Sequence, residues 1–209
     1  MKKKLMTVLA LVLVIAMSVA GTYAYLTSTG EVVNTFTVGN VAITLDEAKA
    51  NTDGTLVEGA DRVKTNSYKL LPGHTYAKDP MVTVLEGSEK CYVKMTVTFS
   101  DAAALDAIFA PNGADMTSIF NGYDSANWEL KNVTKDTGKD TRTYEFWYKA
   151  PVDALNGDVE LDALFDSITV PGTIDNAKLA TIEGMTITVN AYAIQADGFA
   201  NAADAWDHF

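Results

Sequence analysis

Two long stretches of the chain alternate between apolar and other side chains, and this pattern most constrains the fold. Between Cys91 and Phe99, every second residue is apolar and would lie on one face of a strand. Residues 185–195 repeat the pattern, with Met, Ile, Val, Ala and Ala alternating with Thr, Asn, Tyr and Ile. Because both stretches have the two-residue period of a sheet, the chain is predicted to be rich in β-structure.

Shorter segments of the sequence predict the remaining strands and helices. Strands are also expected at 31–38, 41–45, 81–85 and in a hairpin over 127–148, whose polar loop contains Gly138. Short helices are expected at 101–110 (with Ser100 or Asp101 as the cap), at 158–168 and in the tail 197–209. Roughly eight β segments joined mostly by turns indicate an all-β fold, an antiparallel β-sandwich with a few short helices in its connections.

The N-terminus has the layout of a secretory signal. Three lysines, Lys2 to Lys4, precede an uncharged apolar run from Leu5 to Ala20. Small residues allow cleavage after Ala20 or after Ala24, in the second case with Thr22 three positions before the new N-terminus at Tyr25. An uncleaved anchor is the alternative, although the run is shorter than the roughly 20 residues that span a bilayer. The predicted organisation is a signal peptide, 1–24, and one domain, 25–209.

The net charge and the cysteine content limit the classes of function that this chain is expected to have. Removing residues 1–24 takes away three lysines and no acid, which changes the formal net charge from −11 to −14. Such an acidic surface repels phosphates, so nucleic-acid binding is not expected. Cys91 is the only cysteine, and its place on the apolar face of a strand predicts a buried, inert thiol.

Catalytic patterns are missing from the sequence. The two histidines, His74 in a turn and His208 next to the C-terminus, do not have the spacing of a helical zinc motif. No nucleophile elbow, phosphate-binding glycine loop or calcium loop is present. We therefore assign no catalytic residue, metal ligand or cofactor, and expect a protein that is not an enzyme.

The stretch after the predicted signal is β-prone and rich in threonine and valine. A chain end of this kind orders when it pairs with a sheet. It would either join its own sheet or fill the open edge of a neighbouring subunit, which makes head-to-tail filaments.

In its leader, its first predicted strands and one later motif, the sequence resembles the TasA/camelysin family of Gram-positive bacteria. The leader and first strands carry the resemblance: Gly21-Thr22-Tyr23-Ala24, Tyr25-Leu26-Thr27, Asn34-Thr35-Phe36 and Gly39-Asn40-Val41. A later segment resembles the family's L-x-PG-x-x-x-x-K motif through Leu70, Pro72, Gly73 and Lys78. The recognisable part covers about the first 80 residues, and the rest is similar only in kind.

This resemblance implies a jelly-roll sandwich secreted to the cell surface or biofilm matrix. It implies cleavage after Ala24 by a SipW-type signal peptidase, and fibres in which each subunit donates its N-terminal strand to the next copy. The donor would be about Tyr25 to Val38, and its buried side chains would be Val32, Val33, Phe36 and Val38. The expected partners are further copies of the chain and that peptidase, with other matrix proteins as additional candidates and membrane contact only through an uncleaved signal.

Two other functions stay open at this stage. One is a monomeric surface adhesin or ligand-binding sandwich, with hairpin aromatics either in the core or in contact with glycan or protein: Trp128, Tyr144, Trp147 and Tyr148. The other is a surface metalloprotease, because camelysin carries that description, although no zinc motif supports it here.

Overall fold

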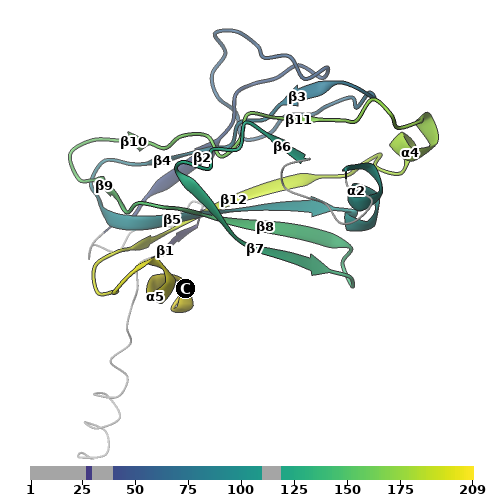
Figure 1. Ribbon diagram of the computed structural model, residues 1–209. Coiled ribbons are helices and arrows are strands. Elements are labelled where there is room, and N and C mark those ends of the chain that lie inside the picture. The colour runs from purple at the N-terminus through teal and green to yellow at the C-terminus, as the bar shows by residue number, and fades with distance from the viewer. Residues whose placement is uncertain (1–26, 30–39, 110–118) are drawn as a thin grey trace, which may run out of the picture.

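The computed structural model describes residues 27–29, 40–109 and 119–209 (Figure 1). This part of the chain is mostly β-structure, and all its strand pairs are antiparallel, as predicted. Its helices are short: α2 (Ala102–Phe109), α4 (Asn176–Ala180) and α5 (Ala202–Asp207). No helix in the described ranges is long and apolar enough to cross a membrane.

The largest sheet has six strands in the order β1-β12-β5-β8-β7, and β9 also pairs with β5. Their bounds are β1 Thr27–Thr29, β12 Ile187–Gln195, β5 Ser88–Ser100, β8 Thr141–Tyr148, β7 Trp128–Asp136 and β9 Val152–Ala154. Both alternating stretches are therefore strands, and they are neighbours: Val189 lies opposite Val97. The predicted hairpin is β7–β8.

Two three-stranded sheets lie over one face of the large sheet (Figure 1). One has the order β10-β4-β2, with bounds Val159–Glu160, Met81–Val84 and Ile43–Asp46. The other has the order β3-β11-β6, with bounds Thr75–Ala77, Ser167–Thr169 and Phe120–Asn121. All six of these strands are only two to four residues long.

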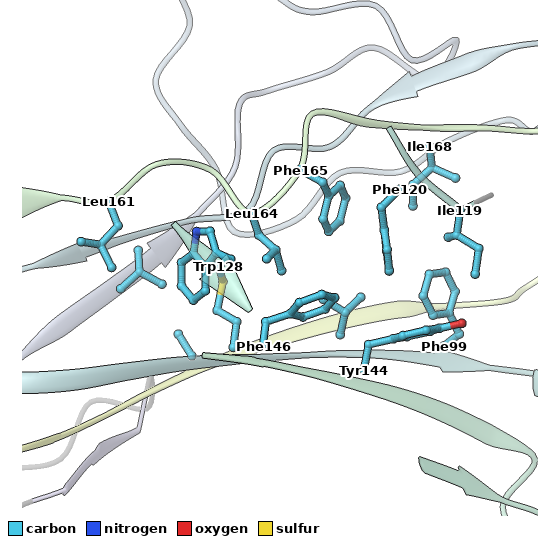
Figure 2. Close-up of a cluster of buried hydrophobic side chains, with 14 of the residues drawn as sticks. Phe99, Ile119, Phe120, Trp128, Tyr144, Phe146, Leu161, Leu164, Phe165 and Ile168 are labelled. Carbon is cyan, nitrogen blue, oxygen red and sulfur yellow. The ribbon is translucent and has the colours of Figure 1, made fainter. Parts of the chain in front are cut away.

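The core fills the space between these layers. Figure 2 shows Tyr144 and Phe146 of β8 pointing toward Phe120 and Phe165, which come from the overlying segments. The Phe120 ring lies 4.5 Å from that of Phe165 and 5.3 Å from that of Tyr144, measured between centroids. Each large apolar side chain buried here stabilises the fold by about 1.5–3 kcal/mol.

The predicted helix at 158–168 is wrong. This segment contains the short strand β10 and then runs extended, because its backbone bonds to the strand below it: Leu161 N–H donates to the Val82 carbonyl and Leu164 N–H to that of Pro80. Its apolar side chains still pack into the core, since Leu161, Leu164 and Phe165 are all buried. Tertiary hydrogen bonds here override a local helix preference.

Helix α2 was predicted at almost its observed position, but its cap differs. The Ala103 N–H is bound by the Asp140 carboxylate, which reaches across from the β7–β8 turn, and the Ala102 N–H by the Asp140 carbonyl. The Asp101 carbonyl accepts only the first helical bond, from Leu105 N–H. The hairpin turn therefore holds the helix start against the sheet.

Cys91 is fully buried, as predicted. Burial, with a smaller contribution from Asp153, raises the pKa of its thiol to about 12. The thiol stays protonated at physiological pH and is a poor nucleophile.

Candidate strand-acceptor site

Along one long edge of the six-stranded sheet, strands of the described ranges pair with only part of β12. Strand β1 pairs with the end of β12, with Thr27 opposite Ile194 and Thr29 opposite Tyr192. From Ile187 to Ala191, no strand of the described ranges pairs with β12 on this side. We call this five-residue stretch the open edge.

The backbone of the open edge points its hydrogen-bonding groups outward. The Thr186 carbonyl accepts from Ser100 N–H at 3.0 Å, and Ala196 N–H donates to the Lys90 carbonyl at 2.7 Å. Even-numbered residues of β12 therefore face β5, and odd-numbered residues face away from it, because these directions alternate along an antiparallel strand. The N–H and C=O groups of Ile187, Val189 and Ala191 are thus directed to the outer side, which is a template for a further strand.

The same residues have apolar side chains that the fold covers incompletely. Ile187 and Val189 lie opposite Phe99 and Val97, so they point to the core side of the sheet. Both are only half-buried, whereas Ala191 further along the same face is buried. Apolar side chains at the core side of this edge are therefore left partly exposed to water.

A cavity of about 820 Å³ opens beside the start of β12, at Ile187. We call it the edge groove. Its lining is largely apolar: Tyr68, Leu70, Phe99, Phe109, Ile168, Val170, Leu179, Ile182, Met185 and Ile187. Three charged residues also line it, namely Lys69, Lys78 and Glu183. Its size and lining suit several apolar side chains.

A buried ion pair fixes the far wall of the groove. The Lys78 ammonium lies 2.6 Å from one carboxylate oxygen of Glu47, and the other oxygen accepts from the Asn66 side-chain amide at 3.1 Å. Both charged residues are buried. Lys78 is the lysine of the motif noted above, and with Glu47 it anchors the start of the 66–70 wall. Sequence reasoning noted Lys78 but missed its partner.

Tyr68 ties this wall to the neighbouring strand. Its hydroxyl donates to the Ala77 carbonyl at 2.6 Å, and its ring packs edge-on against Tyr76. Burial is the main cause that raises the pKa of Tyr68, and the carboxylate of Glu47 adds to it. The hydroxyl therefore remains a neutral donor across the physiological range.

The predicted donor side chains lie outside the described residues, as do those of the predicted cleavage site: Val32, Val33, Phe36, Val38, Thr22, Ala24 and Tyr25. Of the proposed donor segment, the structure describes only Thr27–Thr29. These three residues pair with β12 of their own chain, next to the open edge.

The two histidines are not brought together. His74 immediately precedes β3, and His208 follows α5; these two elements lie on opposite sides of the six-stranded sheet (Figure 1). His208 bonds through Nδ1 to the Asp204 carbonyl oxygen at 2.7 Å, in its own helix. Within 27–29, 40–109 and 119–209, no three His, Cys, Asp or Glu residues are grouped to hold a metal ion.

The aromatic residues of the hairpin do not form an exposed surface that could contact a ligand. Trp128 and Tyr144 are in the core, and the indole N–H of Trp128 donates to the Asp162 carbonyl at 2.9 Å. Trp147 is half-buried, with the Lys131 ammonium 4.9 Å from its ring centre. The ring of Tyr148, also half-buried, packs against Trp128.

Comparison with known proteins adds no relative: no family model, no curated protein and no solved structure matches this chain.

Proposed function

We propose that this protein is a secreted structural subunit of the extracellular or biofilm matrix, and that it forms fibres by donating its N-terminal strand to the next copy. The proposal includes a jelly-roll β-sandwich over residues 25–209 and a leader removed after Ala24 by a SipW-type peptidase. It assigns no catalytic residue. The open edge and the edge groove together are the observation that supports it.

The two halves of this interaction match in chemistry. The acceptor offers outward-facing backbone groups beside half-buried Ile187 and Val189. The donor segment offers alternating apolar side chains, among them Val32 and Phe36. Each large side chain that enters the groove would contribute about 1.5–3 kcal/mol. The backbone bonds set direction and contribute less net free energy.

The pairing of Thr27–Thr29 with its own β12 suggests how a monomer is protected before assembly. In this proposal the segment first lies in its own sheet, and a neighbour's identical segment then replaces it. Such an exchange preserves the contacts and changes only which chain supplies them. Because the contact is head-to-tail, it continues into a filament rather than closing a dimer.

Electron microscopy of three purified chains tests the proposal: the chain from Tyr25, its Phe36→Asp variant, and a chain from Asn40 that keeps the buried residues Val41 and Ile43. We expect fibres from the first chain only, because the Asp carboxylate cannot enter an apolar groove without a large desolvation cost. Circular dichroism should show that all three fold. Undiminished fibres from Phe36→Asp would contradict the proposal.

A second candidate is a monomeric surface protein with the same fold, and the own-chain pairing of β1 is the observation that favours it. Its test is light scattering of the chain from Tyr25 at high concentration. A folded monomer that stays monomeric, with no fibres by microscopy, would place this candidate first. The burial of Trp128 and Tyr144 removes two of the four contact residues predicted for it.

A further inference from the structure

A buried lysine, a carboxylate and a side-chain amide meet at the far wall of the edge groove. Lys78 is the one lysine that is buried within the described ranges. One oxygen of the Glu47 carboxylate lies 2.6 Å from the Lys78 ammonium, and the other accepts from the Asn66 side-chain N–H at 3.1 Å. We propose that Lys78 and Asn66 react here to form a covalent amide bond between their side chains, with Glu47 as the group that moves the protons.

The Asn66 amide is held in one orientation that suits this reaction. Its NH₂ group donates to the Ala48 carbonyl at 2.9 Å as well as to Glu47, and its oxygen accepts from the Ala50 N–H at 2.9 Å. That backbone N–H polarises the amide and would stabilise the negative charge that develops on Oδ1 when a nucleophile attacks the carbon. The amide nitrogen, which would leave, is the atom in contact with Glu47.

Neighbouring charges hold the two reacting segments together. The Arg62 guanidinium bonds to the carboxylates of Asp46 and Asp79, which are the sequence neighbours of Glu47 and Lys78. The segments that carry the proton acceptor and the nucleophile are therefore tied to each other on both sides. Fixing the groups in this way makes the bond-forming step intramolecular, which removes much of its entropic cost.

The reaction balances without any co-reactant. The Glu47 carboxylate takes a proton from the Lys78 ammonium, and the neutral amine then attacks Asn66 Cγ from a distance of about 3–3.5 Å. As the Cγ–Nζ bond forms and the Cγ–Nδ2 bond breaks, Glu47 returns the proton to Nδ2, which leaves as ammonia with the bonding electron pair. Glu47 next removes a second proton from Nζ and gives it to the ammonia. The products are a secondary amide and an ammonium ion.

The surroundings give the product a path of escape and the bond a structural effect. Asn66 and Lys78 both line the edge groove, through which the ammonia can reach water. The bond would close a loop from 66 to 78 that contains the 66–70 wall and β3. Closing a loop restricts the unfolded chain, as a disulfide does, and the single cysteine of this chain cannot form a disulfide within it. The cross-link would form inside one chain, so it does not require fibre formation.

Mass spectrometry of the purified full chain tests the cross-link. We expect a mass lower by one ammonia than the sequence requires. Trypsin cleaves after lysine and arginine, so an unlinked chain gives the peptides 65–69, 70–78 and 79–90, whereas the linked chain gives 65–69 joined to 70–90. Fragmentation of that branched peptide should place the bond between Asn66 and Lys78. Succinimide formation at one of the Asn-Gly pairs loses the same mass but leaves these peptides separate.

Three variants assign the roles, with circular dichroism to check folding. Lys78→Arg keeps a cation beside Glu47 but is not a nucleophile, and Asn66→Ala has no amide, so neither should give the branched peptide. Glu47→Gln keeps the size of the side chain but cannot accept the proton. We expect it to link about a hundredfold more slowly, followed over time after cell-free synthesis.

The unsubstituted chain alone decides whether the bond exists, so the test does not depend on the folding of any variant. A full sequence mass with normal cleavage after Lys78 would overturn the proposal. A mass deficit that persists in Lys78→Arg would also overturn it, because the ammonia would then come from another site. Linking of Glu47→Gln at the unsubstituted rate would contradict the role given to the carboxylate.

Discussion

The two long edges of the large sheet, β7 on one side and the part of β12 that β1 does not pair with on the other, differ in chemistry. Strand β7 carries four charged residues among nine, and its pairing with β8 shifts at a bulge between Leu130 and Asn132. The segment 185–195, which contains β12, has no charged residue. Lys131 and Lys135 of β7 lie in ion pairs with Glu129 (2.8 Å) and Asp106 (3.0 Å).

Within the described ranges, only one of these two edges carries the features that protect a sheet edge from pairing. Lysines and bulges are the usual means by which proteins prevent edge strands from pairing with other chains. Both are present on β7 and neither is found along β12 from Ile187 to Gln195, although the two strands belong to the same sheet. Within the described ranges, β12 from Ile187 to Ala191 therefore has the chemistry that favours pairing with a further strand.

The largest expected effect comes from blocking the open edge with proline. Val189 directs its N–H away from β5, so Val189→Pro removes a bond to an incoming strand without removing one from the β5–β12 ladder. We expect the variant to fold and to form no fibres, as measured by thioflavin binding and electron microscopy.

The matched control is Val133→Pro on β7. Thr134 and Thr143 are paired, and Lys149 N–H bonds to Asn127 across the hairpin, which places the Val133 N–H on the outer side of β7. Its side chain is 43% exposed, so little packing is lost. Fibre yield should equal that of the unmodified chain. Equal loss of fibres from both prolines would show that the two edges do not differ in function.

The second effect concerns the wall of the edge groove. Lys78→Met leaves the Glu47 carboxylate buried without its cation and should lower stability by about 3–5 kcal/mol. Calorimetry should show a melting temperature lower by on the order of 10 °C. Because Asn66 also bonds to Glu47, fibre growth should slow as the 66–70 wall loosens.

The control is the double variant Glu47→Gln with Lys78→Met, which removes both charges and should recover part of the lost stability. An unchanged melting temperature for Lys78→Met alone would mean that the pair does not hold the groove wall.

The sequence predicts the long strands well because their signal is local. The period-two pattern at 91–99 and 185–195, and the hairpin at 127–148, correspond to β5, β12 and the β7–β8 pair. The short strands β3, β6, β9 and β11 carry too few residues to show a period. Residues 158–168 were misassigned because the partners that keep them extended, Val82 and Pro80, are far away in the chain.

The strand-acceptor site, made of the open edge and the edge groove, could not be predicted from the sequence either, because the residues that form it are far apart in the chain. Its groove is built from residues near 66–70, 99, 109, 168 and 179–187, which only the fold brings together. The sequence identified Val189 as part of an apolar face but could not place it at a sheet edge. One local signal was available: 185–195 lacks charge, whereas 128–136 has four charged residues.

The smallest effect is expected from removing the protection of β7. Lys131→Thr with Lys135→Thr eliminates two partly exposed ion pairs, each worth about 0–1 kcal/mol, so the fold should persist. The edge then resembles that of β12, and we expect lateral association at a several-fold lower protein concentration, measured by light scattering. Lys64→Thr with Lys139→Thr removes the same charge from exposed sites that lie in no strand and is the control. If both double variants associate alike, net charge rather than the edge controls the contact; if only the β7 variant associates, the lysines are what keeps the two edges different.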